Sequence, residues 1–209
     1  MTTRNEWFAP PTRARVAELV RQVESQTSAE IVVTVRDAAD GYREADLLAG
    51  VALGFTLLLV YLYLPVTFTD DLVGPAVALA FALGFFLSNR VAPLRRALLT
   101  RRRMHAAVRA AAREAFVDQS IATTRGRNGI LVFVSLLERR VDVVLDVGVV
   151  NAPLPHHWDP IIKTLERSLE RGRGLADFEP ALLALATPLA QALPRQDADI
   201  NELPDEVRA

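Results

Sequence analysis

The chain has 209 residues, no cysteine and a net charge of −1 at neutral pH, and 51% of its residues are hydrophobic. A charge so close to zero excludes a general nucleic-acid-binding protein, which would carry a strongly basic surface. The absence of cysteine agrees with a reducing compartment and excludes a thiol nucleophile.

The first 41 residues predict one helix and one strand. Apolar residues recur at three- and four-residue spacing after Pro11, which is typical of an amphipathic helix with Thr12 as its N-cap. The β-branched run from Ile31 to Val35 then predicts a short strand buried on both faces. Residues 1–8 lack the basic, apolar and cleavage regions of a signal peptide, so we expect none there.

Two uncharged apolar runs follow, from Leu47 to Thr69 and from Leu72 to Asn89. Each is close to the roughly 20 residues that a helix needs to cross a bilayer. A helix in a soluble core rarely stays apolar on every face for this length. Only Asp70, Asp71 and their neighbours separate the runs. We therefore expect a transmembrane helical hairpin over residues 42–92, with spans at about 46–66 and 72–90.

The arginines predict the orientation of this hairpin. Arg43 precedes the first run, many arginines follow the second, and the connector around Asp70 has no basic residue. Basic residues near span ends remain cytoplasmic, so both termini should be cytoplasmic. The eight arginines from Arg90 to Arg113, without an acidic residue between them, are interpreted as this topology signal on a solvated helix face. They could also contact anionic lipid headgroups; the candidates for that contact are Arg95, Arg96, Arg101, Arg102 and Arg103.

The rest of the chain predicts a helix, two strands and two further helices. The expected ranges are 94–119 for the helix, 130–136 and 141–147 for the strands, 159–170 for a helix that Asp159 caps, and 177–193 for the last helix. The four residues between the strands predict an antiparallel pair, and the crossover from the first strand predicts a parallel one. The fold class is therefore α/β: a small sandwich interrupted by the hairpin, with a polar tail over 195–209.

Acidic residues at strand ends are the candidate ligands for a metal ion. Asp37 follows the first strand, and Glu138 lies in the turn after the second. Open α/β sheets bind ligands at these carboxyl ends, and a hard cation such as calcium needs several oxygen ligands. Asp146 is a third candidate ligand. The alternative is that Asp37 is a polar strand end and that Glu138 pairs with a nearby arginine.

Other residue types offer little chemistry. His156 and His157 are adjacent and therefore point in different directions, which makes them a poor chelating pair. The loop from Gly126 to Gly129 has neither the spacing nor the lysine of a phosphate-binding loop, and no serine lies in a nucleophile elbow. No cofactor is evident from the sequence.

Three stretches together resemble the TPM domain family: Thr27–Val33, Asn128–Val141 and Asn201–Pro204. The resemblance implies an α/β/α sandwich formed by residues 1–41 and 93–194, in a subgroup of bacterial membrane proteins whose spans lie inside the domain. Thylakoid members are credited with phosphatase activity, and calcium binding is described in the family. This chain reads Val147–Asn151 where many members carry a Gly-Tyr-Gly-Leu-Glu-like element.

Two functional hypotheses follow. The first is an interaction or scaffold module without a catalytic site, anchored in the bacterial inner membrane, whose cytoplasmic domain binds a protein partner near the bilayer. This hypothesis rests on two features of the sequence. The two long apolar runs indicate a membrane protein, and no recognisable set of catalytic residues is present. The alternative is a metal-dependent phosphatase-like enzyme that acts at the membrane surface.

Overall fold

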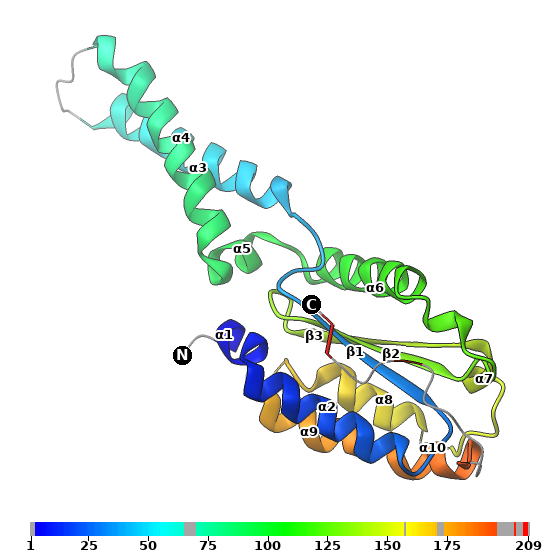
Figure 1. The fold of residues 1–209 in the computed structure, drawn as a ribbon. Coiled ribbons are helices and arrows are strands. Elements are labelled where there is room, and N and C mark those ends of the chain that lie inside the picture. Colours follow the sequence, from blue (N-terminus) through cyan, green and yellow to red (C-terminus); the bar gives the residue numbers. More distant parts are fainter. Residues whose placement is uncertain are drawn as a thin grey trace. The chain divides into compact units, whose positions relative to one another are not determined.

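The chain forms two compact units, residues 1–39 together with 105–209, and residues 40–104 (Figure 1). The computed structural model describes residues 3–64, 70–156, 158–170, 174–195, 203 and 207–208. The first unit contains α1 (Thr3–Phe8), α2 (Pro10–Glu24), β1 (Glu30–Arg36), most of α6 (Arg101–Asp118), η2 (Ile121–Thr123), β2 (Gly129–Ser135), β3 (Arg140–Leu145), α7 (Val147–Val150), α8 (Trp158–Arg167), α9 (Leu175–Leu183) and α10 (Ala186–Ala192). The second contains α3 (Arg43–Tyr63), η1 (Asp70–Leu72), α4 (Val73–Arg90) and α5 (Ala92–Leu98).

The first unit is an α/β domain with a sheet of strand order β1-β2-β3. β1 pairs in parallel with β2, from Glu30 opposite Gly129 to Arg36 opposite Ser135. β2 pairs antiparallel with β3, and Ile130 lies opposite Leu145. The general α/β class, the parallel pair and the antiparallel pair are thus confirmed.

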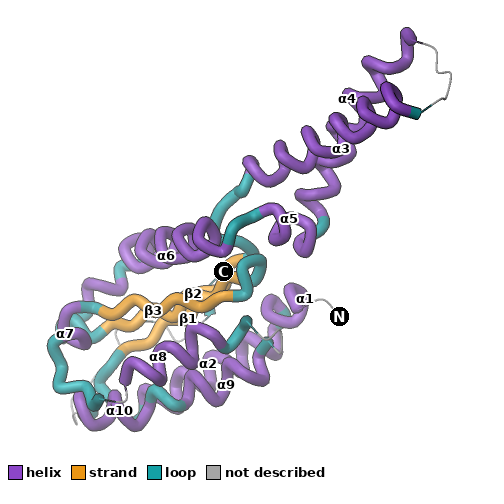
Figure 2. The backbone as a smooth tube through the Cα atoms, turned by 180° about the vertical axis from the view of Figure 1, so that it is seen from behind, coloured by secondary structure: helices purple, strands orange, loops and turns teal. Residues whose placement is uncertain are grey.

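Helices cover both faces of this sheet, as Figure 2 shows. One face packs against α2, α8 and α9 in the larger hydrophobic core, around Leu19, Val132 and Phe178. The other face packs against α6 in a smaller core that contains Val108 and Phe133. Because β1 and β2 are covered on both sides, nearly all their residues are buried. This double burial explains the β-branched runs without polar alternation.

The helix boundaries differ from the predicted ones where capping groups or prolines decide them. Residues 94–119 form two helices because Leu99 is extended and the Thr100 hydroxyl accepts a hydrogen bond from Arg103 N (3.3 Å), as an N-cap does. Residues 177–193 also form two helices, and Pro188 lies in the first turn of α10, where its missing N–H costs nothing. The predicted caps were wrong: α2 begins at Pro10, before Thr12, and α8 begins at Trp158, before Asp159.

Two short helices and part of the tail were not predicted. α1 places Trp7 in the larger core, edge-on to Phe178 with 5.1 Å between ring centroids. α7 follows β3 directly. In the tail, Arg208 bonds to the outer edge of β1: Val35 N donates to Arg208 O (2.9 Å), and Arg208 N donates to Val33 O (3.0 Å). The described part of the tail therefore covers the β1 edge of the sheet.

Candidate functional site

The second unit contains two helices that are long and apolar enough to cross a membrane. α3 has 21 residues, and an 18-residue stretch of it has a mean hydropathy of 2.0; α4 has 18 residues and a mean hydropathy of 1.3. At about 1.5 Å per residue, both lengths are close to the roughly 30 Å of a bilayer core. α3 and α4 thus lie within a few residues of the two predicted spans.

Burial within this hairpin is the reverse of that in a soluble core. Large apolar side chains point outward, among them Phe55 and Phe86, which are 57% and 62% exposed. The buried side chains are small or polar, namely Ala45, Asp46, Ala49, Gly50 and Gly54 on α3, and Gly84 and Ser88 on α4. A hydrophobic core would bury the large residues first. The outer surface of the hairpin is therefore apolar.

Glycines bring the two helices into close contact. A Cβ on Gly84 would lie 2.6 Å from the carbonyl oxygen of Ala49, and one on Gly50 would lie 2.9 Å from that of Phe81. Gly50 and Gly54 are four residues apart and hence on one face of α3. Small residues at this spacing allow helix backbones to pack closely inside membranes.

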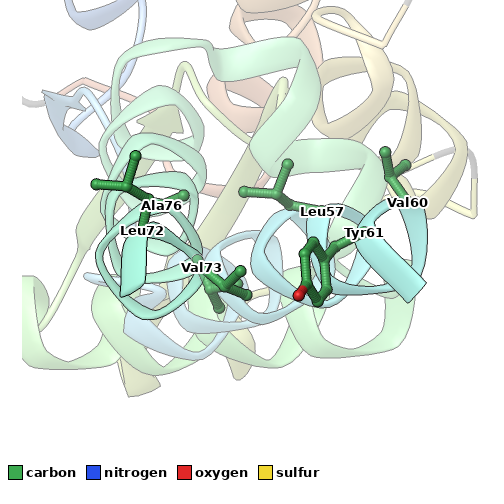
Figure 3. A pocket seen from close by; sticks show the side chains of 7 residues that line it. Leu57, Val60, Tyr61, Leu72, Val73 and Ala76 are labelled. Atoms are coloured by element: carbon green, nitrogen blue, oxygen red, sulfur yellow. The ribbon is translucent and has the colours of Figure 1, made fainter. Parts of the chain in front are cut away.

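A cavity lies between the two helices near the connector (Figure 3). Its volume is about 80 Å³, and it is lined by Leu57, Val60, Tyr61, Leu72, Val73, Ala76 and Val77. Ligand pockets usually measure about 300–1,000 Å³ and present a few convergent polar groups. This space is too small and too apolar for a cofactor.

A buried ion pair joins the helices at the end of the hairpin opposite to the connector. We call this end, which contains Asp46, Ser88 and Arg95, the hairpin base. Asp46, on α3, bonds Arg95 Nη2 of α5 through Oδ2 (2.8 Å) and accepts from the Ser88 hydroxyl of α4 through Oδ1 (2.9 Å). The side chains of Asp46 and Arg95 are only 4% and 13% exposed. Arg95 also donates to the carbonyl of Gly41. One carboxylate thus connects three helices.

A second, more exposed ion pair lies beside the first. The Arg103 guanidinium is 2.6 Å from Asp40 and 3.1 Å from Glu44. Its hydrogen bond to Asp40 lowers the pKa of that carboxyl below the ordinary value. The guanidinium carbons of Arg95 and Arg103 lie 5.9 and 5.5 Å from the centroid of the buried Tyr42 ring, a cation–π arrangement.

The five arginines predicted to contact lipid therefore differ in their surroundings. Arg95 and Arg103 form ion pairs within the hairpin unit, and Arg96 is half-buried. Arg101 and Arg102, in the first turn of α6, are exposed. Only the last two present open guanidinium groups on this helix turn.

The three acidic residues predicted as metal ligands do not converge. Asp37 and Glu138 lie at the same end of the sheet, where Leu137 N donates to the Asp37 carbonyl (2.7 Å). The Glu138 carboxylate accepts from Ala39 N (3.0 Å) and from the Ser135 hydroxyl, so it stabilises the turn. Asp146 follows Leu145, which pairs with the first half of β2, at the other end of the sheet.

Asp146 has a structural role at that other end. It caps α7 by accepting from Val147 N (2.7 Å), and its two oxygens lie 2.9–3.1 Å from the guanidinium of Arg127. The antiparallel direction of β3 explains the failed convergence, because the end of β3 lies beside the start of β2. His156 lies in a loop, and His157 is outside the described residues. Among the residues with described positions, no group of three His, Cys, Asp or Glu could hold a metal ion.

Asp142, in the middle of β3, was not among the predicted site residues. Its side chain faces α6, is only 8% exposed, and within the described residues makes no hydrogen bond or ion pair. Burial raises the pKa of this carboxyl, Glu166 raises it further, and Arg140, Arg109 and Arg113 oppose the rise. The available signal was a charged residue between the apolar residues Val141 and Val143.

Comparison with known proteins supports the fold alone. No family model matches the chain, and no curated protein matches it. The chain is similar to the solved NMR structure of the BA42 protein from the psychrophilic bacterium Bizionia argentinensis, with a TM-score of 0.58 and 15% sequence identity. That similarity covers 97% of this chain and 95% of the other.

Proposed function

We propose that this protein is a membrane-anchored interaction module, in which α3 and α4 span the bacterial cytoplasmic membrane and the α/β unit binds a protein partner at the cytoplasmic surface. The observation that carries the proposal is the inverted burial of the hairpin, with its large apolar side chains outside and its glycines inside. A lipid bilayer supplies the apolar covering that this surface requires, and helices satisfy their own backbone hydrogen bonds there.

The charges at the hairpin base support the same placement. The Asp46–Arg95 ion pair lies near the start of α3 and just after the end of α4, where the membrane interface would be. Ionisable groups at such depths are paired or reach the headgroups. The placement of Arg43, Arg90 and the arginines that follow favours cytoplasmic termini. Arg101 and Arg102 would then contact anionic headgroups, each contributing about 1 kcal/mol.

The resemblance to the TPM family supports a more specific description of the α/β unit. Its three-stranded sheet between α6 on one face and α2, α8 and α9 on the other is compatible with the α/β/α sandwich that the family implies. We propose that the unit is a TPM-like domain interrupted by the hairpin. The candidate metal ligands of the phosphatase alternative do not converge, because Asp146 lies at the sheet end opposite to Asp37 and Glu138.

Reporter fusions in bacterial cells test the anchoring and its orientation. A green fluorescent protein fused after Ala209 should fluoresce in the cytoplasm, and alkaline phosphatase inserted at Asp71 should be active outside the inner membrane. The protein should also remain in the membrane fraction after extraction at alkaline pH. Release by that extraction, or phosphatase activity of a fusion after Ala209, would contradict the proposal.

A further inference from the structure

The chain's own tail occupies one edge of the sheet. Val35 N donates to Arg208 O (2.9 Å) and Arg208 N donates to Val33 O (3.0 Å), so Arg208 lies beside Thr34 as a parallel partner. This is strand addition within one chain, and it has the same hydrogen bonds by which many domains bind an extended peptide at a sheet edge. The outer edge of β1 therefore accepts an extended segment.

A side chain closes the first half of this edge. The N–H of Ile31 points outward, as the bonded groups of Val33 and Val35 do, because alternate residues of a strand direct their backbone groups to the same edge. Ile31 N donates to the Glu24 carboxylate (2.6 Å). A segment that adds to β1 therefore pairs beyond Ile31, at Val33 and Val35.

Two side chains of the tail contact opposite faces of the sheet. Val207 packs against the larger core. Arg208 lies on the α6 side, where its Nη1 donates to the backbone carbonyl (3.2 Å) and the side-chain Oε1 (3.4 Å) of Gln119. That Oε1 also accepts from the Thr34 hydroxyl (2.9 Å), which fixes its position. The site thus selects an apolar residue followed by a long hydrogen-bond donor.

Few described interactions hold the tail in this site. A hydrogen bond of this kind changes an equilibrium by about two- to tenfold. The Arg208 guanidinium bonds neutral acceptors, and no ion pair to it occurs among the residues whose positions are described. Residues 193–206 connect α10 to Val207, and a tether of this length gives the tail an effective concentration of about 1 mM. A partner segment with the same two side chains and further contacts can therefore displace it.

We infer that the β1 edge at Val33 and Val35 is a binding site for an extended, parallel segment of a protein partner in which an apolar residue precedes Arg or Lys, and that Val207 and Arg208 occupy this site until the partner displaces them. The apolar residue takes the place of Val207 against the larger core, and the basic residue takes the place of Arg208 at Gln119.

This inference rests on the proposed role as an interaction module, and it names the partner's chemistry and the regulation of its binding. It does not depend on membrane insertion, because every residue of the site belongs to the α/β unit.

The test measures binding of a fluorescent peptide that copies residues 203–209 to the full chain purified in detergent. The wild type is compared with Arg208→Pro, whose tail lacks the N–H that bonds to Val33 O. Arg208→Pro should bind the peptide with a Kd below about 1 mM, and the wild type should bind it at least about tenfold more weakly because its own tail competes. Arg208→Ala keeps both backbone groups of the tail, so it is the matched control and should lie between the two.

Peptide variants distinguish strand addition from simple charge attraction. Methylating the peptide amide at the position of Arg208 should abolish binding, because that N–H pairs with Val33 O. Methylating the amide one position earlier should leave binding intact, because the backbone groups of Val207 point away from β1. Replacing the peptide arginine by glutamate should weaken binding to Arg208→Pro at least about tenfold, and adding Gln119→Lys to the same chain should reverse this preference.

Several results would overturn the inference. One is the absence of binding by Arg208→Pro at peptide concentrations up to about 1 mM. Another is equal binding by the wild type and Arg208→Pro, because the peptide would then lie elsewhere. Equal binding of both methylated peptides would indicate charge attraction alone. A dimeric wild type that Arg208→Pro converts to a monomer would show that the tail occupies the edge of a second copy. Failure of membrane insertion would contradict the proposed anchoring and leave this peptide test unaffected.

Discussion

The buried ion pair at the hairpin base allows a quantitative prediction. Replacing Arg95 by Gln removes the guanidinium that lies 2.8 Å from the Asp46 carboxylate. The carboxylate stays buried, since Asp46 is only 4% exposed, and it retains one hydrogen bond from Ser88. The Arg95→Gln hairpin should therefore contain an unpaired buried charge.

The magnitude follows from this burial. Removing one partner of a buried pair usually costs about 3–5 kcal/mol. The remaining Ser88 hydrogen bond places the expected loss at the lower end, about 3 kcal/mol, or a factor of more than about a hundred in the opening equilibrium of the hairpin. Arg103→Gln is the matched control in the same unit, because its ion pairs are 42–54% exposed. Exposed pairs of this kind are worth at most about 1 kcal/mol.

Hairpin opening can be measured directly because the chain has no cysteine. Cysteines introduced at Val60 and Val73, which line the same cavity between α3 and α4, would carry a pair of pyrene labels. Excimer emission should disappear as the helices separate under rising dodecyl sulfate in mild detergent. The shift of the midpoint then gives the change in the free energy of opening for each variant.

The double variant Asp46→Asn with Arg95→Gln tests the electrostatic reasoning. It removes both charges, so most of the stability lost in Arg95→Gln should return. The reasoning would be refuted if Arg95→Gln were no more harmful than Arg103→Gln, or if the double variant opened as readily as Arg95→Gln alone.

Three further predictions address the hairpin contact, the lipid contact and the buried carboxylate. Gly84→Val should separate α3 from α4 and abolish the same excimer signal, because even a Cβ at this position would lie 2.6 Å from Ala49 O. Gly74→Val is the control and should preserve the signal, because no atom lies within 4 Å of a Cβ there. Replacing Arg101 and Arg102 by Gln should reduce the anionic lipid that copurifies with the protein, measured by mass spectrometry, and an unchanged amount would contradict their proposed contact with headgroups. Burial raises the pKa of Asp142 above its ordinary 3.8, so the stability that its protonation contributes is present below about pH 4 and is lost as the pH rises through the folded-state pKa. Asp142→Asn should therefore show a smaller drop in unfolding temperature than the wild type on going from pH 4 to pH 7, and parallel curves would contradict this sign.

Sequence patterns predicted the strands and the apolar helices because these depend on local periodicity. The β-branched run in β1 predicted a buried strand, and the four-residue turn before β3 predicted an antiparallel pair; both predictions are confirmed. The apolar length of α3 and α4 likewise predicted two helices able to cross a membrane. Helix ends were less accurate, because single residues decide them: the Thr100 hydroxyl accepts a hydrogen bond at the start of α6, and Pro188 is tolerated only in the first turn of α10.

The sites were harder to predict because they depend on contacts between distant residues. The sequence marks Asp46 and Arg95 as charges near two spans, but their pairing depends on how closely α3 and α4 pack through Gly84 and Gly50. Asp37, Glu138 and Asp146 all follow strands, yet the direction of β3 places Asp146 at the far end. The alternation of residues along β3 predicts which face of the strand Asp142 lies on. Only the position of α6 shows that this face is buried.

Cysteine accessibility in intact bacteria tests the membrane hairpin most directly. The cysteine-free chain permits single substitutions at Asp71, in the connector, and at Asp118, at the end of α6. With the outer membrane permeabilised, a maleimide that cannot cross the inner membrane should label Asp71→Cys and should label Asp118→Cys only after the inner membrane is broken. Equal labelling of the two positions before the inner membrane is broken, or protection of Asp71→Cys until it is broken, would contradict a hairpin that crosses the membrane with both termini inside.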